Sequence, residues 1–217
     1  MSISDYFSIL FVDALGETLY MTLVPTIIAT IIGFIMAVIL VVTKPGGLKP
    51  NKTVNSILGF IVNILRSFPF IILLFALIPF TRMLVGTSIG ETAAIVPITV
   101  GSAPFIARVI ESALDEVDPG LIEAAKSFGA TKTQIVMKVM VKEAMPSIVS
   151  GITLSLISIL GYTAMAGVVG AGGFGKVALM YGYQRFDNNV MTYTVLCLAV
   201  LVQIMQSLGD LLYKKLK

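Results

Sequence analysis

Residues 18–42 read TLYMTLVPTIIATIIGFIMAVILVV and contain no charged side chain. About 20 apolar residues in a helix cross the roughly 30 Å hydrocarbon core of a bilayer. Backbone groups cannot bond to water there, so the stretch is expected to be helical. The whole chain is 57% hydrophobic and 12% charged, whereas soluble domains have about 45–50% and about 25%. These features predict an all-α protein that crosses a membrane several times.

Five apolar segments are long enough to span a bilayer. We place them at 16–42, 56–79, 89–110, 147–170 and 190–212 of the 217 residues. The third contains Pro97, Gly101 and Pro104, and prolines are tolerated where neighbouring helices satisfy the freed carbonyls. We therefore expect that span to be kinked and packed inside protein. At this length we expect one domain over residues 1–217, with a membrane core at about 14–212.

The distribution of Lys and Arg predicts the orientation. The opening MSISDYF has neither residue, so the basic start of a cleavable signal peptide is missing and we expect the first span to be retained. Three cations fall on one predicted side: Arg82, Lys176 and Arg185. Eleven fall on the other side: Lys44, Lys49, Lys52, Arg108, Lys126, Lys132, Lys138, Lys142, Lys214, Lys215 and Lys217. By the positive-inside rule the N-terminus is outside and the C-terminus cytoplasmic.

Residues 118–146, DPGLIEAAKSFGATKTQIVMKVMVKEAMP, are a charged interruption in this apolar chain. Asp118 is a helix N-cap candidate, and Gly129 stands where a left-handed C-terminal cap is expected. Thr131-x-x-Gln134 is a capping-box pattern that starts a second helix, and Pro146 marks its expected end. A cytoplasmic loop or a helix lying on acidic headgroups has this composition. So does a rigid helix that another protein binds.

The EAAKSFG stretch at 123–129 resembles the EAA loop of ABC-importer permeases, which inserts into the ATPase subunit. The stretches ILRSFPFIILL, IPFTRMLVGTSIGETAAIVPITVGSAPFIAR and GYTAMAGVVGAGGFGKVALMYGYQRF resemble the methionine-importer permease family, so the resemblance covers nearly the whole chain. One departure is Val141-Lys142, where the family pattern has Leu-Pro. This departure leaves open whether the usual kink occurs there.

The resemblance implies a type I ABC importer permease fold with five spans per subunit, in the cell membrane of a bacterium. It implies a homodimer that works with two cytoplasmic ATPase subunits and an extracytoplasmic substrate-binding lipoprotein. ATP and Mg²⁺ are then bound by the ATPase, and this chain needs no cofactor, metal or nucleic acid and is no enzyme. The implied coupling residues are Glu123, Ala124, Ala125, Lys126, Phe128 and Gly129.

Three residues are candidates for the translocation path. Arg66 is the one charge deep within a predicted span, and such charges usually face a bundle interior or a cavity. Tyr162 and Met165 of GYTAMAG are candidates for the lining of a gate, since methionine packs adaptably. The alternative for Arg66 is snorkelling or a bond between helices, and for the other two it is ordinary core packing.

Two motif matches point elsewhere and are rejected on context. Residues 170–176, GAGGFGK, match both GxGxxG and GxxxxGK. A P-loop needs Ser or Thr after the lysine, but Val177 is there, and both motifs need a preceding strand. We expect close helix packing or a flexible outer loop. Cys197 is the single cysteine, so the chain cannot form an internal disulfide. It contains no histidine, the commonest metal ligand.

The leading hypothesis is a methionine importer permease, and an ABC importer for another small solute is its nearest alternative. A secondary transporter or channel usually needs acidic residues or histidines in its spans. There are none at 18–42, 56–80 or 146–176. A membrane scaffold that recruits a partner through 118–146 is the third possibility, and reconstituted transport would exclude it.

Overall fold

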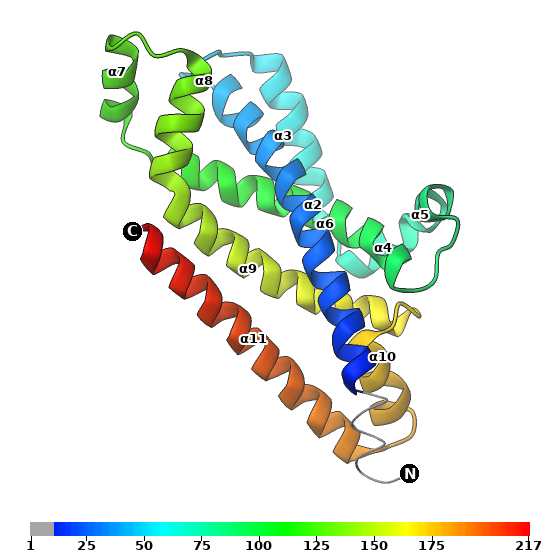
Figure 1. Ribbon diagram of the computed structural model, residues 1–217. Helices are drawn as coiled ribbons and strands as arrows, with labels where there is room; N and C mark the ends of the chain where they lie inside the picture. Colours follow the sequence, from blue (N-terminus) through cyan, green and yellow to red (C-terminus); the bar gives the residue numbers. More distant parts are fainter. Residues whose placement is uncertain (1–10) are drawn as a thin grey trace.

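The computed structural model describes residues 11–217, and this part of the chain forms helices without a strand (Figure 1). The opening MSISDYF, on which the signal-peptide expectation depends, lies outside the described residues. The elements are α2 (Asp13–Thr43), α3 (Lys52–Ser67), α4 (Phe70–Ala76), α5 (Ile78–Val85), α6 (Glu91–Asp115), α7 (Pro119–Ser127), α8 (Lys132–Gln134), π-helical η2 (Ile135–Met140), α9 (Val141–Val168), α10 (Gly173–Val177), π-helical η3 (Ala178–Tyr183) and α11 (Asn188–Leu216).

By length and composition, four helices of residues 11–217 can cross a bilayer. These are α2, α6, the continuous helix Lys132–Val168 and α11, and they confirm four of the predicted spans. A fifth span results if α3 and α4 are taken together. The prediction of helical spans was successful because long apolar segments leave the backbone no alternative in lipid.

The second predicted span is not one straight helix. α3 and α4 meet at an angle of 104°, and the break falls at Phe68 and Pro69. A residue before proline is pushed out of the helical region by the proline ring, and Phe68 has ψ of 131°. Arg66 therefore lies in the last turn of α3, exposed and next to a bend, rather than deep within a straight span.

The core centres on the crossing of α2 and α6, which is the most extensive helix contact in the described chain. Ala29, Gly33 and Ala37 recur every fourth residue along α2. A Cβ on Gly33 would lie 2.9 Å from the carbonyl oxygen of Ala103 on α6, so the backbones approach closely through small residues. In α6, 61% of the most apolar stretch is buried, against 17% in α11. The expectation that the third span packs inside protein is confirmed.

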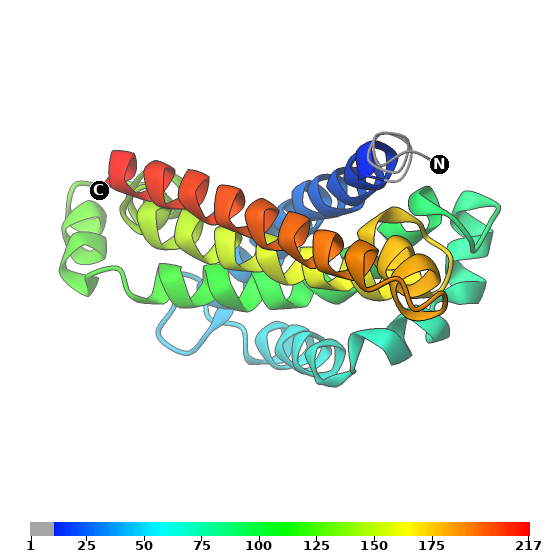
Figure 2. The same cartoon turned by 90° about the horizontal axis from the view of Figure 1, so that it is seen from below.

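Two opposite sides of the molecule flank this core. Figures 1 and 2 show α6 and α9 in the middle, α3 along one side, and α11 with the start of α2 along the other. The C-terminal end of α11 points to the end of the molecule that carries α7. The α3 side and the α11 side are therefore separate surfaces.

Pro146 does not end a helix as the sequence predicted. The helix that begins at Lys132 continues through it to Val168 over 37 residues. A proline in a helix frees the carbonyl four residues earlier, which here belongs to Lys142, an exposed residue. The helix also runs through Val141-Lys142, by way of the π-helical turns of η2.

Candidate functional site

α7 is held by its own end residues. Asp118 accepts a hydrogen bond from the Gly120 backbone N–H at 2.7 Å, and Pro119 occupies the first turn. Proline there loses no bond, because the first backbone donors of a helix have no intrahelical acceptor. The predicted N-cap is confirmed.

The other end of α7 is a Schellman cap. Gly129 has φ of +77° and donates its N–H to the Lys126 carbonyl at 2.9 Å. The Ala130 N–H reaches the Ala125 carbonyl at 3.0 Å. This pair of bonds defines the motif, and the left-handed residue favours glycine. The left-handed cap expected at Gly129 is confirmed.

The chain then turns directly into the next helix. Thr131 Oγ1 accepts from the Gln134 N–H at 3.3 Å, and Gln134 Oε1 accepts from the Thr131 N–H at 2.8 Å. The capping box read from the sequence is thus present. It joins α7 to the long helix that continues into α9, with only residues 128–131 between the two helices.

Side chains on α7 divide into a packed and a free face. Ile122 and Ala125 pack against the main core. Glu123, Ala124 and Lys126 are exposed, as is Gly129 after the helix. Phe128 is 91% exposed, and covering an exposed phenylalanine side chain with a partner would remove apolar surface from water. This end of the described chain therefore presents an exposed face of α7 with an aromatic side chain beside it.

A cleft of about 220 Å³ lies at the base of α7, where Glu123 and Lys126 face the loop after α2. Lys44 and Asp115, which both line it, form an ion pair of 2.7 Å. Both side chains are 38% exposed, so solvent screens the pair and its stabilisation is small.

The structure brings together two of the three path candidates. Arg66 and Tyr162 line one cavity of about 140 Å³, close to the size of an engineered cavity of about 150 Å³ that binds benzene. Tyr162 stacks on Phe70, with ring centroids 4.3 Å apart and planes 11° from parallel. Phe105 is also in the wall. Met165 does not line this cavity and is 39% exposed.

Sequence reasoning missed a polar cluster between α3 and α6. Arg108 contacts Glu111 at 2.6 Å, and it donates to Asn63 Oδ1 at 2.9 Å and to the Gly59 carbonyl at 3.4 Å. Arg108 therefore lies within α6 and connects this helix to α3 through hydrogen bonds. The predicted orientation had counted Arg108 only as a cytoplasmic cation. The available signal was the helical spacing of Gly59, Asn63 and Arg66 on one face of α3.

The glycine-rich loop of residues 170–175 packs tightly against α2, as one of the two expectations had it. The Glu17 carboxylate accepts from the Gly173 N–H, and Thr18 Oγ1 accepts from the Phe174 N–H at 2.9 Å. A Cβ on Gly175 would meet the Ala164 carbonyl oxygen at 2.2 Å. The glycines serve close packing, and side chains of α2 occupy the N–H groups that a nucleotide phosphate would need.

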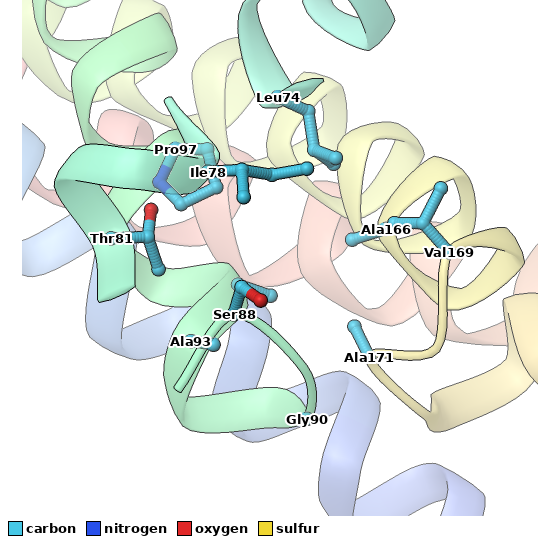
Figure 3. A pocket seen from close by; sticks show the side chains of 11 residues that line it. Leu74, Ile78, Thr81, Ser88, Gly90, Ala93, Pro97, Ala166, Val169 and Ala171 are labelled. Carbon is cyan, nitrogen blue, oxygen red and sulfur yellow. The ribbon is translucent and has the colours of Figure 1, made fainter. Parts of the chain in front are cut away.

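A smaller cavity lies between α5, the start of α6 and the end of α9 (Figure 3). Its volume is about 20 Å³, which is room for about one water molecule. Thr81 lines it, and the Thr81 hydroxyl has no hydrogen-bond partner among residues 11–217. The cavity suits a water molecule and is too small for an amino acid.

Within the described residues, no three His, Cys, Asp or Glu side chains are grouped so that they could hold a metal ion. The fold and site define a polytopic helical membrane protein with a short, capped and largely exposed helix at one end and a small polar cavity beside a broken helix.

Residues 29–217 match the family described as binding-protein-dependent transport system inner membrane component, and the chain belongs to this family. It is 52% identical over 200 residues to the methionine import system permease protein MetP of Bacillus subtilis, covering 92% of this chain and 90% of the relative. It is 50% identical over 158 residues to the D-methionine transport system permease protein MetI of Escherichia coli K12, covering 73% of each.

Solved structures agree with this assignment. A chain in the inward-facing conformations of the MetNI methionine ABC transporter superimposes with a TM-score of 0.96 at 47% identity, covering all of both chains. An amino acid ABC transporter crystallised with histidines gives a TM-score of 0.74 at 21% identity, which shows a shared fold alone. The chain thus has the type I ABC importer permease fold and is a multi-pass protein of the bacterial inner membrane.

Proposed function

We propose that this chain is the permease subunit of an ATP-driven importer that moves methionine, as the L- or D-isomer, into the cytoplasm. The observation that carries the proposal is α7, a capped helix with the EAA motif and an uncovered Phe128 at its end. The relatives named for methionine at 50% and 52% identity support the substrate. The MetNI likeness supports an assembly of two copies of this chain with two ATPase subunits.

In this proposal the α7 end faces the cytoplasm, where eleven of the fifteen Lys and Arg residues fall. The cytoplasmic coupling segment is 118–146, and the whole chain is one permease domain. The ATPase subunits bind ATP with Mg²⁺ and hydrolyse it, so this chain catalyses no reaction. A substrate-binding protein delivers the solute on the opposite side.

The continuous helix from Lys132 to Val168 is the mechanical link. It begins next to α7 and carries Tyr162 near its other end. Closure of the ATPase subunits moves α7, and a rigid helix transmits that movement to the cavity as a rigid-body shift. Alternating access follows when the two permease copies move relative to each other.

The cavity beside the α3–α4 bend forms part of the path. The Arg66 guanidinium suits the carboxylate of an amino acid, since such pairs are strong and directional. Phe70, Phe105 and Tyr162 offer surface to a thioether chain. Met165, exposed one turn beyond Tyr162, faces the second permease copy at the gate in this proposal.

The experiment reverses one charge on the docking helix. Glu123→Lys places a cation where the partner site is complementary to a carboxylate, and such a reversal weakens binding strongly. We expect at least tenfold less ATPase subunit to co-purify, with unchanged membrane insertion. Glu116→Lys is the matched control, because Glu116 is also exposed but lies outside α7 and outside residues 118–146, and it retains wild-type recovery.

Wild-type co-purification of Glu123→Lys contradicts the docking assignment. Uptake of labelled methionine by vesicles that hold the full assembly tests the substrate separately. If the vesicles import a different solute and not methionine, the importer function stands and the assignment of methionine as substrate is wrong. If no solute is taken up, the result supports the membrane scaffold instead.

A further inference from the structure

An open apolar groove of about 410 Å³ lies between α2, α9 and α11. Its walls are leucine, isoleucine, valine and methionine side chains, and Thr153 bonds its hydroxyl to the Val149 carbonyl at 2.9 Å. Ile204 and Leu208 on its rim are 51% and 57% exposed. The groove is lined by α11, which Figure 2 shows on the side of the molecule opposite α3.

The groove has a close-packed floor. A Cβ on Gly209 would lie 2.3 Å from Thr153, so α11 and α9 touch there. Leu19 of α2 packs against the cluster that contains Leu201, at the end of the groove away from α7. From Leu201 to Leu212 the wall of α11 is about 16 Å long, at about 1.5 Å per residue. That length is about half of the roughly 30 Å hydrocarbon core, which is one leaflet.

Two lysines extend the walls at the other end. Lys142 precedes Val149 by seven residues on α9, and Lys215 follows Leu208 by seven on α11. Residues seven apart lie on one helix face, so both lysines continue the groove walls, and both are exposed. On α11, Asp210 lies on the opposite face, where it accepts a hydrogen bond from Gln206 at 3.0 Å. The groove is thus basic at the end nearest α7, just beyond its apolar walls.

We propose that this groove binds an anionic glycerophospholipid, with one acyl chain along α9 and α11 and the phosphate between Lys142 and Lys215. A chain of one leaflet's length fits the apolar walls, and two cations at membrane-surface depth attract an anionic headgroup. The inference rests on the membrane placement in the proposed function. In the proposed importer the second permease copy packs on the α3 side, because α3 and α4 line the Arg66–Tyr162 cavity assigned to the path, and the α11 side then faces lipid.

The chain contains no tryptophan, so a single introduced one reports on its own surroundings. The full chain with Ile204→Trp is placed in vesicles of phosphatidylcholine that contain brominated phosphatidylglycerol or brominated phosphatidylcholine, and quenching gives the relative affinity. Leu208→Trp repeats the measurement if Ile204→Trp folds poorly. Leu196→Trp is the position control, since Leu196 is 55% exposed on another face of α11 and nearer its start.

We expect about a threefold preference for phosphatidylglycerol at Ile204→Trp and none at Leu196→Trp. Adding Lys142→Gln and Lys215→Gln removes the preference. Adding Lys214→Gln and Lys217→Gln removes the same charge from other faces of α11 and leaves the preference unchanged.

Equal quenching by both lipids at Ile204→Trp overturns the proposal, because the groove then meets only bulk lipid. Absence of quenching also overturns it and shows that protein, such as a second copy of the chain, covers the groove. If the preference for phosphatidylglycerol falls equally in the Lys142/Lys215 variant and the Lys214/Lys217 variant, it reflects general surface charge. That result overturns the proposed site. No outcome depends on the ATPase or on the solute, so failure here is distinguishable from failure of the importer function.

Discussion

Gly129 and Gly175 lack a side chain for different physical reasons. Gly129 has φ of +77°, and a methyl group added there would have nothing within 4 Å of it. Gly175 has no such φ, but a methyl group there would overlap the Ala164 carbonyl. Backbone conformation selects the first glycine and packing selects the second, so the two respond differently to substitution.

At Gly129, we expect coupled transport at matched expression to fall in the order Gly129, Gly129→Asn, Gly129→Ala, Gly129→Val. An L-residue in this conformation costs about 1–2 kcal/mol, asparagine tolerates it best, and a β-branched residue is the least tolerated. Solute-stimulated ATPase activity and membrane insertion are measured together, and only the first should change. Normal coupling in Gly129→Val contradicts the role of this cap, and an equal loss in all three points to packing against the partner.

Gly175→Ala should lower the thermal unfolding temperature of the purified chain and reduce the folded yield. The methyl group meets backbone atoms of α9 that cannot rotate away, so α10 must shift. Gly161→Ala in α9 is the control, because a Cβ added at Gly161 would have nothing within 4 Å of it. Circular dichroism melting in detergent compares the two, and equal melting contradicts the tight packing of the glycine-rich loop.

At the scale of elements, α3 is connected to α6 by the Arg108 cluster. Arg108 and Glu111 are 27% and 15% exposed as side chains, so both charges are largely withdrawn from water. Beside them Asn63 accepts from Arg108. α3 itself buries only Val62 among its residues, so this polar tie is a main contact that fixes α3 and hence the position of Arg66.

A double-mutant cycle tests the tie. Arg108→Met leaves the Glu111 carboxylate without its ion-pair partner, and we expect a loss of about 2 kcal/mol in stability. Arg108→Met with Glu111→Met removes both charges and should recover much of that loss, as replacement of a buried pair by apolar residues often does. Unfolding in detergent measures all variants. Additive losses would show that the two residues act independently.

At the scale of the whole molecule, the orientation stays a prediction based on eleven cations against three. In a Cys197→Ser background, Asn188→Cys should react with an impermeant thiol reagent added to intact cells, and Thr133→Cys should not. Both positions are exposed, so accessibility in the protein is matched. The reverse labelling pattern would invert the topology and remove the coupling function.

The sequence by itself determined the features that depend on neighbouring residues. Apolar length determined the helical membrane class, because lipid offers the backbone no other partner. The caps at Asp118, Gly129 and Thr131 were predictable because each involves residues only a few positions apart. The family pattern placed the EAA motif on that capped helix.

Only the tertiary structure decided where distant residues meet. Pro69 is a local signal that a helix ends at Phe68, but neither it nor hydropathy gives the 104° angle between the two apolar segments. The same packing brought Tyr162 to Arg66, left Met165 outside their cavity and turned Arg108 from a surface cation into a tie between helices. These placements depend on how helices cross, and crossing is determined by close contacts such as Gly33 against Ala103, which no local pattern encodes.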